Sequence, residues 1–232
     1  FAVQSALYLV AFIALFGVRL PPRTAPPAAR PPMRDAAREG ARYVFGRPAL
    51  RALVVASVMT GLFQLGPIFV LIPEIARTRL EVDAALNSLL LAFTSIGMLI
   101  MSAFLAKRGG LGRKGYWFLV NLLVAGPAMV VMGISGWYPL TAVALFVWGL
   151  NGGVHINMNQ ALIQMNTPNE MMGRVMSIYM LSIAGLIPLG SLMSGVTAEI
   201  IGADGALMLA GVVFGVYSVW AFFAERELKA LD

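Results

Sequence analysis

Long apolar runs separated by short polar breaks dominate the chain. Each run has roughly 20 residues, and an α-helix needs about that length to cross a hydrocarbon core of about 30 Å. The runs lack the alternation of apolar and polar positions that barrel strands show, so helices are the expected spanning elements. The pattern predicts an all-α, polytopic membrane helix bundle with seven spans, at 1–18, 49–75, 84–106, 115–134, 138–165, 175–199 and 205–224.

Composition excludes several other classes of protein. Hydrophobic residues make up 59% of the chain, charged residues only 12%, and the mean hydropathy is +0.81. A soluble domain of this length cannot bury so much apolar surface. The net charge of +6 does not indicate nucleic acid, because the basic residues flank apolar runs, where anionic lipid headgroups lie. The chain has no cysteine, which excludes disulfides and thiolate chemistry.

Residues 19–47 differ from the rest of the chain. Prolines crowd 21–32 and arginines recur throughout, which is typical of an extended, solvated linker. The second part, 35–45, mixes charged residues with Tyr43, Val44 and Phe45, and this mixture predicts a short amphipathic helix at the membrane surface. Asp35 is the expected N-cap of that helix.

The chain begins at Phe1, inside an apolar run, which predicts a fragment of a longer protein. A cleaved signal peptide is the alternative. Such a peptide has basic residues before its apolar stretch, whereas here they follow it, at Arg19 and Arg23.

The distribution of Lys and Arg predicts the orientation, since cytoplasmic loops hold the excess. All basic residues except Arg77 and Arg79 fall on one side if the linker is cytoplasmic. The predicted location is therefore the bacterial cytoplasmic (inner) membrane, with a multi-pass chain, a cytoplasmic C-terminus and an N-terminus on the outer side.

The span 138–165 is the least lipid-like. Its amides and imidazole are Asn151, His155, Asn157, Asn159, Gln160 and Gln164. Positions 151, 155 and 159 recur every four residues and share one helix face, and Gln160 and Gln164 share an adjoining one. Because such groups are costly against lipid, the face must meet protein or water. A cavity wall that binds a polar solute and a set of interhelical hydrogen bonds are both consistent with it.

His155 is the one ionisable group placed well inside a predicted span. Its titration range suits a proton-coupling role, and a neutral, hydrogen-bonded histidine is the alternative. Outside this span, Gln64 and Asn87 are further candidate cavity residues. Gln64 lies near Gly61, Gly66 and Pro67, a combination that favours a bent or loosened helix.

Small residues recur at four-residue spacing, at Gly149/Gly153, Gly190/Ser194, Ser191/Gly195 and Gly211/Gly215. Such pairs permit close helix contact, and packing within one bundle is favoured over dimerisation. No HExxH, GxSxG, Walker A or strand-linked GxGxxG motif occurs, and one histidine without a buried carboxylate supplies no catalytic or metal cluster. The sequence predicts no enzyme, cofactor or metal.

Three segments resemble the major facilitator superfamily of transporters. AREGARYVFGRPALRAL at 37–53 looks like the entry to the seventh helix in a branch of bacterial exporters that includes the enterobactin exporter. TPNEMMGRVMSIY at 167–179 is similar to that branch's loop between helices ten and eleven, with Met172 where an arginine is common. AKRGGLGRKG at 106–115 resembles the loop between helices eight and nine, but its aspartate is missing.

The resemblance implies the last transmembrane helix of an N-terminal half at 1–18, a linker at 19–47, a C-terminal six-helix half at 48–224 and a tail at 225–232. It further implies that helices seven, eight, ten and eleven line a cavity. It places gating functions in two loops, at Arg113, Lys114, Glu170, Gly173 and Arg174. Glu170 and Arg174 are expected either to pair locally or to contact a neighbouring helix.

The predicted function is secondary active transport, with proton-coupled efflux of a small organic solute such as a drug or siderophore by alternating access. The predicted partners are that solute, protons, membrane lipids and the N-terminal half of the same transporter, with no nucleic acid. A non-transporting membrane module and a polytopic membrane enzyme are the alternatives.

Overall fold

The computed structural model describes residues 5, 8–10, 12–14, 33–108 and 112–231. The chain divides into two units, Phe1–Met33 and Arg34–Asp232. In the first unit, the described residues between positions 5 and 14 are helical. The remainder of the predicted span at 1–18, and the proline-rich part of the predicted linker, lie outside the described residues.

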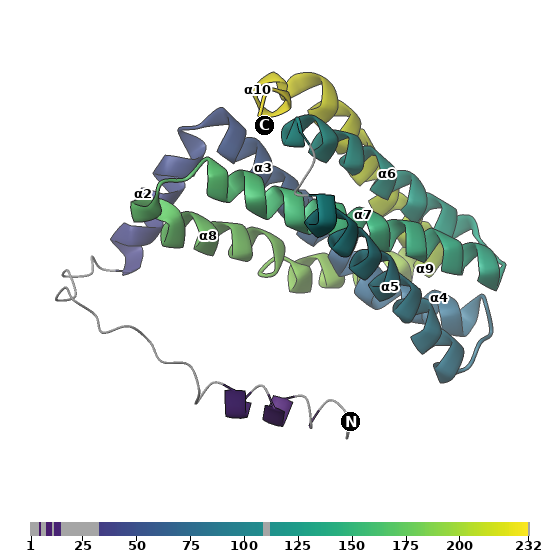
Figure 1. Ribbon diagram of the computed structural model, residues 1–232. Coiled ribbons are helices and arrows are strands. Elements are labelled where there is room, and N and C mark those ends of the chain that lie inside the picture. The colour runs from purple at the N-terminus through teal and green to yellow at the C-terminus, as the bar shows by residue number, and fades with distance from the viewer. Residues whose placement is uncertain (1–4, 6–7, 11, 15–32, 109–111, 232) are drawn as a thin grey trace. The chain divides into compact units, whose positions relative to one another are not determined.

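The second unit is built from helices only, as far as the described residues show (Figure 1). In chain order they are α2 (Met33–Phe45), α3 (Pro48–Thr60), the π-helix η1 (Gly61–Leu65), α4 (Gly66–Thr78), α5 (Ala84–Arg108), α6 (Lys114–Ile134), α7 (Tyr138–Met165), α8 (Asn169–Ile183), α9 (Ile187–Ala224) and α10 (Arg226–Lys229). Helix α2 begins at Met33, so Asp35 lies in its first turn and the prediction that it caps the helix is wrong.

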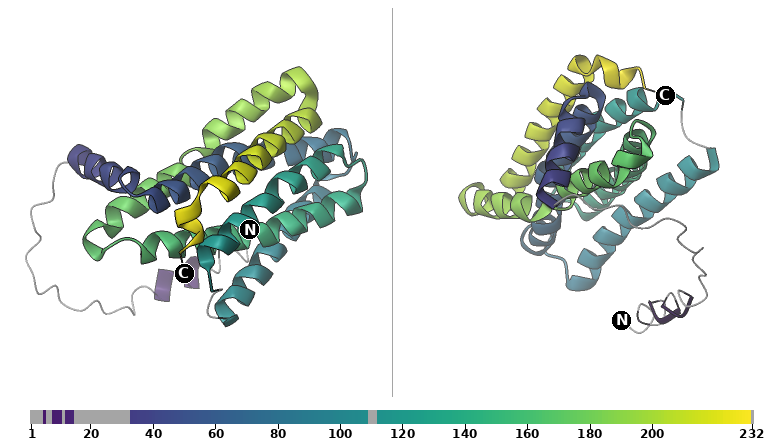
Figure 2. Two further views of the ribbon diagram at one scale, coloured as in Figure 1. Left: turned by 90° about the horizontal axis from the view of Figure 1, so that it is seen from above. Right: turned by 90° about the vertical axis from the view of Figure 1, so that its left-hand side faces the viewer.

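Five helical stretches among the described residues are long and apolar enough to cross a membrane. They are Pro48–Thr78, Ala84–Arg108, Lys114–Ile134, Tyr138–Met165 and Asn169–Ala224. The last has 56 residues, far more than one crossing needs. It is interrupted at Gly202, whose φ of 79° and ψ of 160° are not helical. Figure 2 shows the two arms of α9 side by side, so this stretch supplies two crossings, as the predicted spans 175–199 and 205–224 require.

Close backbone contacts hold the helices together where glycines face a neighbour. A Cβ atom at Gly149 of α7 would lie 2.2 Å from the Thr94 carbonyl oxygen of α5, and one at Gly153 would lie 2.8 Å from that of Met98. Gly126 of α6 and Gly211 of α9 meet in the same way. The small-residue spacing therefore serves packing within the bundle at these positions, as predicted.

Two irregular segments lie next to each other. The π-helical turn η1 separates α3 from α4, and residues 184–186 form a turn between α8 and α9. A Cβ atom at Gly66 would lie 2.6 Å from the Gly190 carbonyl carbon, and Ser191 Oγ donates to the Gly66 carbonyl oxygen at 3.2 Å. The glycine-rich sequence around Gln64 correctly indicated a loosened helix, whereas the turn at 184–186 interrupts a span predicted as continuous.

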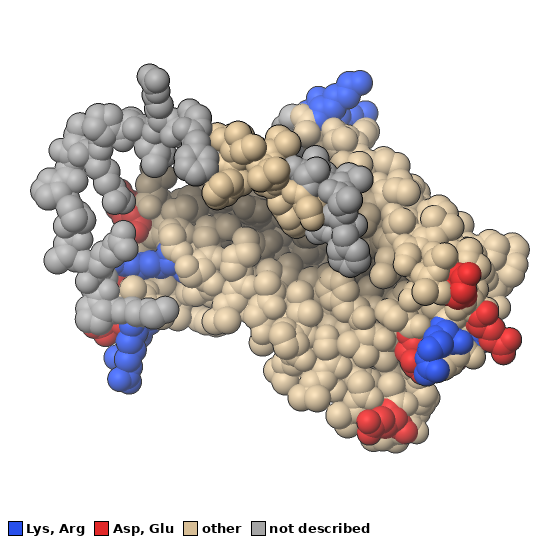
Figure 3. All heavy atoms as spheres, turned by 90° about the horizontal axis from the view of Figure 1, so that it is seen from below, with Lys and Arg blue, Asp and Glu red and all other residues tan. Residues whose placement is uncertain are grey.

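Much of the unit's surface is apolar, as a lipid contact requires. Leu99 of α5, Val143 of α7 and Phe223 of α9 are 70%, 59% and 70% exposed. In the face seen in Figure 3, charged side chains lie at the periphery and a broad uncharged surface lies between them. Exposed apolar patches of this extent mark a membrane or partner interface.

Replacing Gly149 by alanine is expected to destabilise the unit, because the new methyl group would overlap the backbone of α5. Overpacking of this kind costs about 1–3 kcal/mol. Gly195→Ala is the matched control, because its Cβ would have no heavy atom within 4 Å. Thermal unfolding in detergent measures both variants, and an equal loss of stability at the two positions would contradict the packing described.

Candidate functional site

The polar face of α7 lies inside the bundle. The side chains of Asn151, His155 and Asn159 are only 5%, 3% and 0% exposed. All three have partners on α3 or α6, so the face meets protein and not the lipid-facing surface. The four-residue spacing places these groups one above another along α7.

His155 is joined to the irregular segment of the α3–α4 span. Its Nε2 lies 3.3 Å from Thr60 Oγ1, and Gln64 Nε2, in η1, donates to the same hydroxyl at 3.5 Å. The imidazole also lies beside the ring of Phe118, with centroids 5.2 Å apart. Its Nδ1 is buried and has no hydrogen-bond partner among the described residues. The histidine therefore has one nitrogen bound at the π-helical turn and one that can take a further partner.

Asn159 and Asn151 connect α7 to two different helices. Asn159 Nδ2 donates to Ser57 Oγ of α3 at 2.9 Å, while its Oδ1 is buried and finds no partner in the described part of the chain. Asn151 Nδ2 donates to the Asn121 carbonyl oxygen of α6, and Asn121 Nδ2 donates back to the Asn151 carbonyl oxygen at 3.1 Å. Polar pairs of this kind join transmembrane helices.

The other predicted cavity residues do not all join this cluster. Gln64 is buried and belongs to it through Thr60, whereas Gln160 is half-buried and Gln164 is exposed. Asn87 lies elsewhere, in a groove of about 350 Å³ that Glu74 and Asp83 also line. The structure thus brings together four of the seven candidates along the buried face of α7 and in η1, and leaves three apart from them.

Sequence reasoning missed Ser57 and Thr60, the hydroxyl partners on α3. A single hydroxyl in an apolar span is a weak signal, because it can bond its own helix, as Ser57 Oγ does to the Leu53 carbonyl oxygen at 2.9 Å. Asn157 was not selected either, although its Nδ2 donates to Ser102 Oγ of α5 at 2.9 Å. Only the fold shows which hydroxyls face the amides of α7.

The predicted gating residues lie at the starts of two helices, α6 and α8, so their predicted placement in loops is wrong for all but Arg113. Arg113 has a left-handed backbone, with φ of 56°, and precedes α6, which begins at Lys114. Arg174 of α8 forms an ion pair with Glu39 of α2, with Nη1 and Oε1 2.6 Å apart. Glu170 and Gly173 are exposed. Arg174 therefore contacts a neighbouring helix, the second of the two alternatives that the sequence left open.

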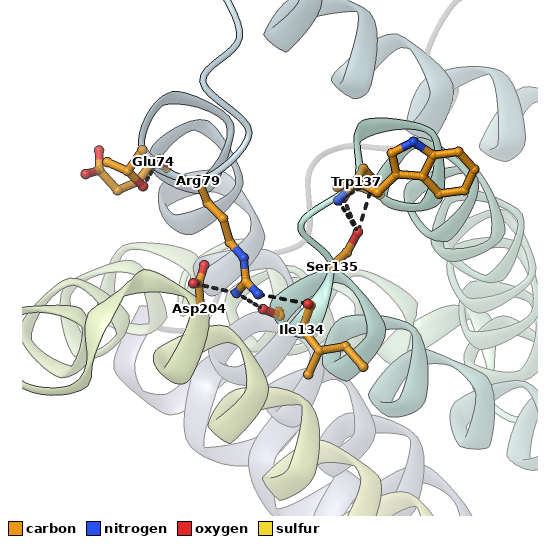
Figure 4. Close-up of polar contacts among 9 residues, drawn as sticks. Glu74, Arg79, Ile134, Ser135, Trp137 and Asp204 are labelled. Atoms are coloured by element: carbon orange, nitrogen blue, oxygen red, sulfur yellow. Dashed lines mark hydrogen bonds and ion pairs between the residues drawn. The ribbon is translucent and has the colours of Figure 1, made fainter.

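A further polar cluster joins three elements at the far end of the α3–α4 span (Figure 4). Arg79 Nη1 donates to Asp204 Oδ2 at 2.6 Å and to the Gly133 carbonyl oxygen at 2.7 Å. Arg79 Nη2 donates to the Ile134 carbonyl oxygen at 2.9 Å. The guanidinium group thus satisfies two carbonyls at the end of α6, where helix backbones lack internal partners. Sequence reasoning had treated Arg79 only as a charge on one side of the membrane.

Repeated apolar crossings with their polar groups turned inward define an integral, multi-pass membrane protein. The chain belongs to the Major Facilitator Superfamily, which its sequence matches over residues 1–188. It is 26% identical over 202 residues to the multidrug efflux pump Tap of Mycolicibacterium fortuitum. That alignment covers 84% of this chain and 47% of the pump, so the chain spans about half the length of this curated relative. No solved structure matches the chain. The family is one of transporters, and the name of this relative describes an efflux pump.

Removing either amide of the α6–α7 pair is expected to weaken the bundle. Asn151→Leu and Asn121→Leu should each lower the free energy of unfolding by about 1 kcal/mol, the usual scale for one interhelical hydrogen bond in a membrane. Gln164→Leu, at an exposed position of the same helix, is the control and should change it less. Reversible unfolding in mixed micelles provides the measurement, and equal effects at positions 151 and 164 would argue against the pairing.

Arg79→Ala is expected to destabilise the unit more than Asp204→Asn does. The aspartate variant loses one partly exposed ion pair, worth under about 1 kcal/mol, whereas the arginine variant also loses two bonds to the end of α6. Arg77→Ala is the matched control on the same helix, because Arg77 forms a local surface ion pair with Glu74. Melting temperatures that fall in a different order would overturn this assignment.

Proposed function

We propose that this chain is the C-terminal part of a secondary active exporter that moves a small organic solute across the bacterial cytoplasmic membrane. The observation that carries the proposal is the bond between His155 and Thr60, which joins a buried polar helix face to the π-helical turn of a neighbouring span. A transporter must let such helices change their relation while keeping buried polar groups satisfied. Membership of the Major Facilitator Superfamily supports this proposal.

The proposed organisation follows the predicted one. Residues 1–18 are the last helix of an N-terminal half, 19–47 the linker, 48–224 the C-terminal half and 225–232 a cytoplasmic tail. Helix α5 is largely exposed, because only Leu90, Gly97 and Leu105 of its 25 residues are buried. This exposure supports the proposal that a further part of the protein packs against α5. In the proposed whole protein, the N-terminal half covers part of this face.

The proposed solute is a drug or a siderophore. The relative's name describes a multidrug efflux pump, and the segments at 37–53 and 167–179 resemble a branch of exporters that includes the enterobactin exporter. Gln160 and Gln164 are proposed to face the solute cavity, since they are less buried than the amides behind them. The polar core of that wall is proposed to consist of Asn151, His155, Asn159 and Gln64. Asn87 is proposed to contact the solute nearer the membrane surface.

We further propose that export is coupled to proton entry through His155. Its unpartnered Nδ1 provides a place for a proton or a water molecule, and the described spans carry no carboxylate near their middle. The starts of α6 and α8 are proposed to close the cytoplasmic side, in line with the excess of basic residues there. The residues concerned are Arg113, Lys114, Glu170, Gly173 and Arg174.

The experiment replaces His155 in the complete protein and measures solute efflux from cells or vesicles. His155→Gln keeps hydrogen-bonding capacity but cannot titrate near neutral pH. Export by the unmodified protein is expected to speed up as the outside becomes more acidic, whereas export by His155→Gln should be slow and insensitive to that gradient. His155→Ala and Asn151→Ala should also transport less while inserting normally.

Val143→Ala, at a lipid-exposed position of the same helix, is the control and should transport normally. Unchanged export with an unchanged response to pH in His155→Gln would remove the proton-coupling role. Normal transport by both alanine variants would remove the proposed solute site.

A further inference from the structure

Helix α2 contacts α8 at one point, around Glu39 and Gly40. Glu39 forms its ion pair with Arg174, and Val44 is fully buried. A Cβ atom at Gly40 would lie 3.1 Å from both Arg174 Cβ and Ile178 Cδ1 of α8, so the two helices approach closely at this point. Figure 1 shows α2 passing the first part of α8. The position of α2 is therefore set by specific contacts and not by the linker alone.

The other side of α2 carries a row of exposed cations. Arg34, Arg38 and Arg42 recur every four residues, which places them on one face, and all three are exposed. Phe45, one turn further on, is 55% exposed. An open groove of about 770 Å³ runs along this helix, and its lining residues are Asp35, Arg38, Glu39, Ala41, Arg42 and Phe45. Of the two acidic residues, Glu39 is already engaged by Arg174.

This row is close in sequence to the first described membrane-spanning stretch. Only two residues separate Phe45 from Pro48, where the first described membrane-spanning stretch begins. Arg47, in this connection, lies over the ring of Tyr43 at 3.8 Å from its centroid, which fixes the connection against α2. A row of arginines next to a membrane-spanning stretch, ending in an exposed aromatic ring, has the charge and shape to meet lipid phosphates with an apolar side chain below them.

We propose that α2 is a binding site for anionic phospholipid headgroups. Arg34, Arg38 and Arg42 pair with headgroup phosphates, and Phe45 inserts among the first acyl carbons. Because α2 is tied to α8 through Glu39 and Arg174, a bound headgroup also steadies the start of α8. This inference goes beyond the transport function and does not depend on it.

The test replaces the exposed residue Ala37 by cysteine. Because the chain has no cysteine of its own, this thiol is the single labelling site. The complete chain, purified in a neutral detergent and labelled there with an environment-sensitive fluorophore, is titrated with phosphatidylglycerol or with phosphatidylcholine. The anionic lipid is expected to bind about tenfold or more tightly than the zwitterionic one, and salt should reduce the difference. Equal binding of the two lipids would overturn the proposal.

Charge variants locate the site. Arg34→Gln/Arg38→Gln/Arg42→Gln should lose the preference for phosphatidylglycerol, and the corresponding triple lysine variant should keep it. Lys107→Gln/Arg108→Gln/Arg226→Gln removes the same charge from other exposed positions and should keep it as well. Equal losses in the two glutamine variants would mean a diffuse electrostatic attraction and would refute a site on α2.

Two further readouts separate the remaining explanations. Soluble glycerol phosphate should not compete with the lipid, because it lacks the acyl chains that Phe45 contacts, and full competition would refute a lipid site. If the triple glutamine variant does not fold, the triple lysine variant decides, since loss of the lipid preference in that folded, equally charged protein would also contradict the proposal.

Discussion

The structure depends on one constraint, that a polar group inside an apolar slab must find its partner within the protein. Helix α7 carries more of these groups than any other described helix of the bundle, and Asn151, His155 and Asn159 each have a partner on α3 or α6. Among the described residues, His155 Nδ1 and Asn159 Oδ1 are still without one. Asn151 exchanges hydrogen bonds with Asn121, and Asn159 bonds Ser57. These bonds determine which face of α7 turns inward, and they leave the apolar side chains of the bundle to meet lipid.

The same constraint explains where the backbone departs from the α-helix. The π-helical turn η1 and the turn at 184–186 lie against each other, where neighbouring backbone and hydroxyl groups are available. Their close contact through Gly66 and Gly190 means that a change in one segment must be accommodated by the other. The His155–Thr60 bond adds α7 to this arrangement. In an exporter, a set of helices linked in this way can move as a group while its polar groups stay paired.

Much of the architecture was predictable from the sequence. The length of a membrane crossing and the cost of charge in lipid together produce long apolar runs with charged residues confined to the breaks between them. The six spans of 49–224, the amphipathic helix before them and the loosened segment around Gln64 follow from those two effects. The partners were not predictable. Arg79 and Asp204 are 125 residues apart, and Arg174 bonds Glu39 on another helix although Glu170 lies one turn away. The turn at 184–186 was also missed, because apolar residues continue on both sides of it.

The most direct measurement of the central claim is the accessibility of spin labels along α7 in bilayers. Labels at positions 151 and 159 should collide rarely with both oxygen and a water-soluble nickel complex, since these positions are enclosed by α3 and α6. Labels at Val143 and Trp220, which are 59% and 55% exposed, should collide often with oxygen, as lipid-facing residues do. High oxygen accessibility at positions 151 and 159, equal to that at 143, would show that the polar face meets lipid and would contradict the account.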